Sequence, residues 1–406
     1  MQKFEKHSPV VVTEVTTKHE LRQFMQYPNR LYADNPNYIP SFYGDDLSDW
    51  TPGKNPAFDY CEARCWLARR DGEIVGRIGA ILSHKANDKF GTHRMRFSQV
   101  DFVDDSEVSA ALFGTVERWA REKGCDQVHG PLGFTDMDRE GMLVEGFDRR
   151  SLFFTNYNAP YYLEHLTRLG YRKDVDWIEY RITVPEPGGA EAERLHKLSE
   201  FILKRKHLHV ATVHHKSEYG PFVRQVFELV NAAYAPLYGV VELSDEQIER
   251  YANKFIPLVD PDFVCFVVDE QDQLVAFGVT ALDPSVALKH SDGRLFPFGW
   301  AGVLNDLHHS DTLIMLLTAV RPDLQTEGIN AVMMDHVCQS CNRHGVRFAE
   351  TGPMLELNDH ILAQWKRLEK EQHKRRRCFI KDLDHDVNAA NAAEAQTETP
   401  ETESAE

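Results

Sequence analysis

Long hydrophobic runs are missing from this sequence of 406 residues. No stretch approaches the roughly 18 apolar residues that are needed to span a bilayer. Residues 1–12 also lack the apolar core that marks a secretory signal. We therefore expect a cytoplasmic protein without membrane insertion.

Cysteine and basic residues are also scarce. The 7 cysteines are an odd number spread thinly through a long chain, which favours reduced thiols over a disulfide framework. Lys and Arg number 46 against 63 Asp and Glu, so the net charge is −17. Nucleic-acid binders usually gather basic residues on one face to displace phosphate counterions, so no nucleic-acid partner is expected.

A segment rich in proline and glycine divides the chain. Residues 183–189, Thr-Val-Pro-Glu-Pro-Gly-Gly, follow a strand-like run and interrupt regular structure. Leu195, Leu198 and Ile202 then recur at helical spacing, which predicts a helix leading into the second half. The predicted organisation is an N-terminal unit at 1–185, a linker and helix at 186–206, a C-terminal unit at 207–385 and a disordered acidic tail at 386–406.

The two halves share features in the same order, which indicates duplication of one unit. Each half begins with two apolar runs around a polar turn, the pattern of a β-hairpin. Each continues with a strand and a helix that ends at a glycine, Gly124 or Gly345. Each then has a short strand closing on Gly-Pro, at Gly130 and Gly352. The expected fold class is α/β with a mixed sheet, built as two tandem units.

One segment lies between an apolar strand and a helix and could bind an anion. A chain that leaves a strand into a helix exposes unpaired N–H groups and the positive end of the helix dipole, which suits a pyrophosphate. Gly328 would let the backbone approach that group closely. The alternative is that Gly328 only eases a tight turn.

The segment resembles motif A of the GNAT acyltransferases, Gln/Arg-x-x-Gly-x-Gly/Ala. Gln325 and Gly328 match the motif, and Asn330 stands where Gly or Ala is usual. The resemblance implies acyl-CoA or acetyl-CoA as co-substrate. The residues implied to hold it are Val320, Gln325, Thr326, Glu327, Gly328, Ile329 and Asn330.

Motifs elsewhere resemble a YghO-like bacterial family with tandem GNAT-type units. They include Gly141-Met-Leu-Val-Glu-Gly-Phe147 and Tyr157-Asn-Ala-Pro-Tyr-Tyr162 in the first half, and Glu350-Thr-Gly-Pro353 in the second. The resemblance covers most of residues 10–385. It implies an acyl-CoA-dependent N-acyltransferase and leaves the amine substrate, a small molecule, unidentified.

Catalysis in such a fold needs few side chains, because an amine attacks a thioester and a base or water removes its proton. Glu350, at the end of a strand, is a candidate for proton removal; the alternative is a surface carboxylate or the partner of an Arg. Asn358 could bond the pantetheine or thiolate; the alternative is a helix N-cap. Its counterpart in the first half is Asp136. Trp365 lies on the helix where a GNAT tyrosine is expected.

A long insertion at 283–309 is rich in aromatics and glycine. Long internal loops often act as lids or substrate-binding segments, although a segment that only covers the core is the plainer alternative. Together with the helical region before it, the insertion could form an acceptor pocket. The candidates are Tyr238, Glu242, Phe298 and Trp300, with Tyr234 nearby.

Three further patterns receive structural interpretations. Asp104 and Glu107 resemble a helix-capping pair at the equivalent loop of the first half, which would repel pyrophosphate. Residues 338–344, with two cysteines and a histidine, repeat at the core-facing period of a helix, so no metal site is expected. The basic run 374–377 could contact the 3′-phosphate of CoA, or could be a solvated approach to the last strand.

The main functional prediction is an acyl-CoA-dependent N-acyltransferase with an unidentified amine acceptor. One alternative is a long-chain acyl or aminoacyl transferase of tandem-GNAT type. The other is a non-catalytic CoA-binding or interaction protein with this fold. The sequence leaves the acyl length and the oligomeric state open.

Overall fold

The computed structural model describes residues 8–383. A 14-stranded sheet runs through both halves in the order β1-β2-β3-β4-β5-β14-β7-β12-β11-β10-β9-β8, with β6 and β13 at its side. The first half contains β1 (Val11–Glu14), α1 (Lys18–Leu31), α2 (Tyr43–Asp49), a 3-10 turn (Pro56–Asp59), β2 (Cys61–Arg70), β3 (Glu73–Ser83), α3 (His84–Phe90), β4 (Arg94–Phe102), α4 (Ser106–Glu122), β5 (Gln127–Gly130), β6 (Met142–Glu145), α5 (Tyr162–Arg168) and β7 (Arg172–Thr183).

The second half repeats the plan of the first. It contains α6 (Ala190–Lys206), β8 (His209–Val210), α7 (Gly220–Tyr234), α8 (Asp245–Phe255), β9 (Val264–Val268), β10 (Leu274–Leu282), α9 (Ser285–His290), α10 (Gly299–His309), β11 (Thr312–Val320), α11 (Asn330–His344), β12 (Phe348–Glu350), β13 (Met354–Leu355), α12 (Asp359–Ala363) and β14 (Lys370–Asp382), with short 3-10 turns at Lys216–Tyr219, Ile256–Leu258, Pro261–Phe263 and Pro322–Leu324. The helix predicted after the Pro/Gly segment is α6. The insertion at 283–309 forms α9 and α10.

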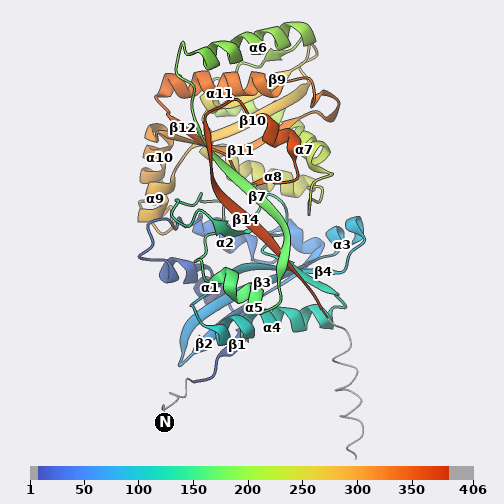
Figure 1. The fold of residues 1–406 in the computed structure, drawn as a ribbon, viewed down its shortest axis with the longest axis vertical. Coiled ribbons are helices and arrows are strands. Elements are labelled where there is room, and N and C mark those ends of the chain that lie inside the picture. The colour runs from blue at the N-terminus through green and yellow to red at the C-terminus, as the bar shows by residue number, and fades with distance from the viewer. Residues whose placement is uncertain (1–7, 384–406) are drawn as a thin grey trace, which may run out of the picture.

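Helices cover both faces of each half of the sheet (Figure 1). In the first half, α4 and α5 pack on one face through Leu112, Phe113 and Leu166, while α1 and α2 lie on the other. In the second half, α6 and α11 bury one face and α7 and α8 bury the opposite one. Because apolar residues follow each strand on both faces, each sheet half needs a helical layer on each side.

Local sequence explains where the elements turn and end. Asp71 and Gly72 both have positive φ, 52° and 84°, as a two-residue hairpin turn between β2 and β3 requires. Gly124 and Gly345 follow α4 and α11 with φ of 73° and 71°. Both glycines therefore end their helices in the left-handed conformation, as predicted.

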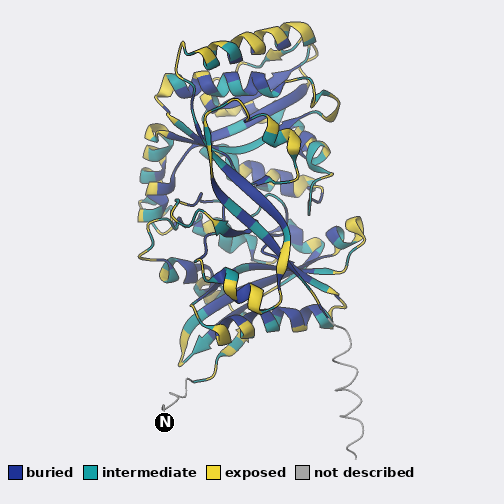
Figure 2. Cartoon of the chain, viewed as in Figure 1, coloured by how far each residue is buried: buried dark blue, intermediate teal, exposed yellow. Residues whose placement is uncertain are grey.

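The two halves exchange their last strands. β14, from the end of the chain, lies between β5 and β7 and pairs with β5 from Gly130 opposite Phe379. β7, from the first half, pairs with β12 in the second half, where Ile182 lies opposite Ala349. Figure 1 shows both long strands running between the halves, and Figure 2 shows that much of their length is buried. The predicted units at 1–185 and 207–385 therefore each receive one strand across the linker.

No helix within residues 8–383 is long and apolar enough to cross a membrane. The seven cysteines are all free and buried. The acidic tail predicted at 386–406 lies outside the described residues.

Candidate functional site

The central feature of the second half is a split between the parallel strands β11 and β12. Their pairing ends where Ile314 lies opposite Glu350. The next N–H, of Thr351, donates to the carbonyl of Tyr180 on β7 at 2.9 Å, so the chain turns away from β11. From Met315 onward, β11 is paired only with β10 on its other side. One backbone edge of β11 is thereby left open to a ligand.

The predicted pyrophosphate loop follows the open end of β11. Helix α11 begins at Asn330, because Gly328, two residues earlier, has a φ of 80° and cannot be part of the helix. No side chain caps this helix N-terminus. A Cβ at position 328 would lie 3.2 Å from Cδ1 of Ile202 on α6. The N–H groups of Ala331 and Val332 donate to the carbonyls of Gly328 and Ile329 at 2.9 Å in a tight first turn. The close backbone of the loop and the positive end of the helix dipole are the features that suit an anion.

The loop side chains leave its backbone accessible. The Gln325 amide donates to the carbonyl of Val320 at 3.3 Å and braces the turn. Glu327 pairs with Lys206 at 2.6 Å, which offsets its negative charge. Thr326 is exposed, whereas Ile329 is 1% exposed and anchors the loop in the core.

Beside the split lies a cleft of about 180 Å³. It opens between β11, α11 and the segment around α12, and its lining is mostly apolar. The indole N–H of Trp365 in its wall donates to the Met354 sulfur at 3.1 Å. Other lining residues are Ile182, Val184, Met315, Asn330, Met333, Met334, Val337, Cys338, Cys341, Ile361 and Leu368.

A second cavity of about 240 Å³ lies on the opposite face of the sheet, under α7 and α8. We call it the chamber. The cleft and the chamber share six lining residues and therefore meet within the split: Tyr234, Val279, Leu316, Leu317, Gly352 and Pro353. The Tyr234 hydroxyl donates to the carbonyl of Thr318 on β11 at 2.8 Å, so it stands where the two cavities join.

The first half contributes carboxylates to the chamber. Asp136, Asp138 and Glu140 line it from the segment after β5. Burial raises the pKa of Asp136 to about 6. Burial, followed by the charge of Asp136, raises the pKa of Glu140 well above its usual range. Asp138 instead accepts the N–H groups of Phe134 and Thr135 and stabilises the turn.

Sequence reasoning did not select Asp136 or Glu140 as site residues. In the sequence, Asp136 stands out only as the counterpart of Asn358. The available signal was the acidic run Asp136-Met-Asp-Arg-Glu140 placed directly after a buried strand and Gly-Pro. Local pattern alone does not show that this run from the first half reaches a cavity walled by the second.

The two predicted catalytic residues lie near the split and make structural contacts. Glu350 ends β12, where its carboxylate contacts Lys374 at 3.3 Å, and burial raises its pKa. It does not line either cavity. Asn358 accepts the N–H of Ile361 at 3.2 Å and is the N-cap of α12, as the alternative interpretation had it.

The predicted acceptor residues are not brought together. Phe298 and Trp300 are 81% and 48% exposed, and Phe298 lines a separate open depression beside α9 and α10. Glu242 is exposed, and its carbonyl accepts the Lys85 ammonium at 2.5 Å. Tyr238 lies at the β5 and β14 junction. None of the four lines the cleft or the chamber.

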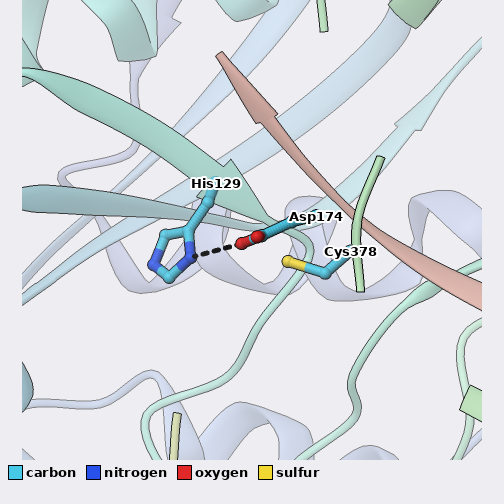
Figure 3. A group of neighbouring side chains, drawn as sticks. All are labelled: His129, Asp174 and Cys378. Carbon is cyan, nitrogen blue, oxygen red and sulfur yellow. Dashed lines mark ion pairs between the residues drawn. The ribbon is translucent and has the colours of Figure 1, made fainter. Parts of the chain in front are cut away.

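Tyr238 instead joins His129, Asp174 and Cys378, whose donor atoms lie close enough to suit a metal ion (Figure 3). Its hydroxyl donates to Asp174 at 2.5 Å, lies 3.1 Å from His129 Nδ1 and 3.5 Å from the Cys378 sulfur. The hydroxyl thus occupies the space between the three groups. Burial lowers the pKa of His129 and raises that of Cys378, so the cluster is a hydrogen-bond network of neutral groups around Asp174.

The equivalent loop of the first half is capped, but by a different residue than predicted. Asp105, rather than Asp104, accepts the N–H groups of Glu107 and Val108 at the start of α4. Asp105 also pairs with Arg70, and Asp104 pairs with His165 at 2.9 Å. The side chains of the basic run 374–377 pair with carboxylates, namely Asp176, Glu179, Glu350 and Glu356.

Comparison with known proteins gives two relatives that cover most of the chain. Protein YghO of Escherichia coli (strain K12) is 27% identical over 379 residues, 92% of this chain and 95% of that protein. A bacterial ceramide synthase of Caulobacter vibrioides is 28% identical over 300 residues, 72% of this chain and 75% of that protein. No family model matches the chain.

Solved structures share the fold at low identity. A tandem GNAT protein from the clavulanic acid biosynthesis pathway superposes with a TM-score of 0.52 at 13% identity, covering 92% of this chain and 99% of that one. A GCN5-related N-acetyltransferase from Sphaerobacter thermophilus gives a TM-score of 0.50 at 13% identity, covering 92% and 96%. The fold is therefore that of tandem GNAT proteins.

Proposed function

We propose that this chain, a YghO-like protein with the tandem GNAT fold, is an N-acyltransferase that moves an acyl group from CoA to an amine. The N-acyltransferase fold of the solved relatives and the name of the Caulobacter relative, a ceramide synthase, support acyl transfer. The donor would occupy the second half only.

The split between β11 and β12 is the observation that carries the proposal. A thioester on a long pantetheine arm needs an extended channel with backbone partners, and the open edge of β11 from Met315 to Val320 offers them. The channel ends at the loop with Gly328 and at the uncapped N-terminus of α11. A pyrophosphate there would receive backbone N–H groups and the favourable helix dipole.

The thioester itself would lie where the cleft and the chamber meet. Tyr234 stands at this junction with its hydroxyl on the Thr318 carbonyl, within reach of a departing sulfur. Burial raises the pKa of Tyr234, so its hydroxyl is protonated and can donate. Glu350, fixed by Lys374 at the apex of the split, would position the end of β12; its predicted part in proton removal stays a prediction.

Calorimetric titration with CoA, acetyl-CoA and palmitoyl-CoA tests the donor site directly. Gly328→Ala should weaken binding at least tenfold, because the side chain meets Ile202 and the positive φ disfavours alanine. Gly345→Ala is the matched control, since Gly345 has a similar φ of 71° at the other end of α11 and open space around it. Equal affinity in both variants would refute the loop assignment.

A long-chain acyl donor is the more specific form of this proposal. The cleft beside the split is lined mostly by aliphatic, methionine and tryptophan side chains, and burial of each methylene contributes about 0.8 kcal/mol. Palmitoyl-CoA should then bind more tightly than acetyl-CoA. Acetyl-CoA binding alone would favour short acyl groups, and binding of all thioesters without turnover on any amine would favour the non-catalytic alternative.

A further inference from the structure

Most of the wall of the chamber under α7 and α8 is apolar. Aliphatic and aromatic side chains from both helices and from the sheet surround it. A space of about 240 Å³ with mostly apolar walls accommodates an aliphatic chain. The wall residues include Tyr219, Val223, Val226, Phe227, Ala252, Phe255, Ile256, Val259, Val264, Phe266, Leu316 and Leu317.

The polar residues of the chamber are grouped on the segment after β5. Asp136 and Glu140 are partly buried, and within residues 8–383 neither carboxylate forms an ion pair or a hydrogen bond with another residue. The nearby guanidinium of Arg96 is committed to the carbonyls of Gly133, Phe134 and Gly239. Two partly buried carboxylates that no cation contacts directly favour a ligand with a positive group.

The missing positive charge and the apolar walls define one kind of ligand. We propose that the chamber binds the acceptor of the reaction, a primary amine on an aliphatic chain, with its amino group at Asp136 and Glu140 and its chain under α7 and α8. The proposal rests on the acyl-transfer function above and names its substrate class. It also gives the first half a role, because the two carboxylates come from its β5 segment.

The position of the chamber fits the reaction. Gly352 and Pro353 line both cavities, so an amine in the chamber faces a thioester in the cleft through the split. The ammonium first loses one proton to Asp136 or Glu140. Its nitrogen then forms a bond to the thioester carbon, the carbon–sulfur bond breaks, and the second proton leaves with the sulfur. The products are an amide, free CoA thiol and the proton held by the carboxylate.

Calorimetry with amines alone tests the site without any donor. Decylamine should bind, while decanol, which lacks the charge, and propylamine, which lacks the chain, should bind at least tenfold more weakly. Similar affinities for decylamine and decanol would overturn the part assigned to the carboxylates. Similar affinities for decylamine and propylamine would overturn the part assigned to the chain.

Variants locate the binding in the chamber. Asp136→Asn and Glu140→Gln keep the side-chain shape and should each weaken decylamine binding about tenfold, whereas Glu122→Gln, an exposed carboxylate of α4, should not. Val223→Phe narrows the chamber and should favour shorter amines; Val11→Phe, at a position 54% exposed on β1, is its control. Unchanged binding in all chamber variants that melt like the parent chain would overturn the proposal.

Product analysis by mass spectrometry separates this proposal from the donor proposal. Charge-dependent decylamine binding without amide formation from any acyl-CoA would support the chamber and refute acyl transfer. Amide formation that is equal for propylamine and decylamine, and insensitive to Glu140→Gln, would support acyl transfer and refute the chamber. Formation of N-decyl amides that falls with Asp136→Asn and Glu140→Gln would support both.

Discussion

The two halves of this protein repeat one fold, and they differ at the point where two parallel strands part. After β12, the N–H of Thr351 bonds to β7, so β11 loses its neighbour. After β5, the N–H of Leu132 bonds to the carbonyl of Phe97 on β4 at 3.0 Å, so the chain stays on β4. The two halves therefore differ in one backbone hydrogen bond after the short strand. In the second half this bond goes to β7 and leaves β11 open, and in the first half it goes to β4 and closes the gap.

The N-terminus of the helix after the central strand also differs between the halves: it is capped by a side chain in the first half and has no such cap in the second. In the first half, Asp105 caps α4, and Tyr162 receives the N–H of Phe102 at the end of β4 at 2.7 Å. In the second half, α11 has no side-chain cap, and Gly328 opens the loop before it. Side chains occupy in the first half the positions that a ligand would occupy in the second. The first half thus supports the second and supplies carboxylates to its chamber.

The strand exchange underlies this comparison, and breaking it gives the largest expected effect. Glu179 on β7 is 0% exposed and pairs with Lys374 at 3.1 Å and with Arg376 on β14. Burial alone would raise its pKa, but the two cations outweigh it and lower the pKa to about 2. Glu179→Gln leaves two buried cations short of a partner and should cost about 3–5 kcal/mol in denaturant unfolding.

The pH dependence sharpens this prediction. Because the folded pKa of Glu179 is depressed, its contribution is present above the unfolded value of 4.5 and is lost as pH falls toward about 2. The variant should therefore approach the parent chain in stability under acid conditions. Glu145→Gln, whose carboxylate is 60% exposed and pairs with Arg375, should change stability by less than about 1 kcal/mol. A small loss at Glu179 would mean that the exchanged strands are not held by this pair.

Closing the open split should make the second half resemble the first. A Cβ at Gly352 would lie 3.4 Å from the Met315 carbonyl and 3.5 Å from the Phe154 ring, so the backbone tolerates a side chain there. The ring in Gly352→Phe would extend into the junction of cleft and chamber. We expect amide formation to fall about 100-fold, because the reacting groups can no longer align.

A matched control separates blockage from unfolding. Gly44→Phe, at an exposed position with open space around it, should retain activity, and both variants should melt within a few degrees of the parent chain. Retained activity in Gly352→Phe would place the reaction outside the split.

Tyrosines provide the next comparison, because one sits in each half near the end of a central strand. The Tyr162 hydroxyl bonds Phe102 at 2.7 Å and also Tyr32 at 2.7 Å. Tyr162→Phe should cost about 1–3 kcal/mol by leaving buried polar groups unpaired, with turnover unchanged. Tyr234→Phe should instead lower turnover about tenfold with a smaller loss of stability. Thermal unfolding and rate measurements on both variants check the contrast, which fails if Tyr162→Phe is the less active of the two.

Several features of the fold follow from local sequence. The glycines after α4 and α11, the helix after the Pro/Gly segment and the repeated order of strands are set by short-range rules, and they are where the sequence predicts them. The start of α11 at Asn330 depends on the backbone of Gly328, whose φ of 80° lies outside the helical region. The strand exchange depends on contacts between distant segments, which no local pattern records.

The residues of the candidate site also fall into two groups, those that are contiguous in the sequence and those that only the fold brings together. The loop at 320–330 is continuous in sequence, so its residues could be selected together. Asp136 and Glu140 come from the first half, whereas α7 and α8 above the chamber come from the second. The two carboxylates matter because they line the chamber, are partly buried and have no ion-pair partner. Phe298 and Trp300 were selected for their composition. Aromatic composition alone does not distinguish a pocket wall from an exposed segment, and both side chains are exposed.

The smallest expected effect is a gain in folding stability, whereas the other variants lose stability or activity. Since the folded pKa of Asp136 is raised to about 6 from 3.8, its charge destabilises the folded state. This cost is absent below pH 3.8, grows between the two values and is complete above about 6. Asp136→Asn should therefore be more stable than the parent chain by about 1–2 kcal/mol at pH 8, and equal to it near pH 3.5. Denaturant unfolding at the two pH values measures the difference. A variant less stable at pH 8 would show that Asp136 has a stabilising partner, and the first half would then supply the chamber with one unpaired carboxylate, Glu140, instead of two.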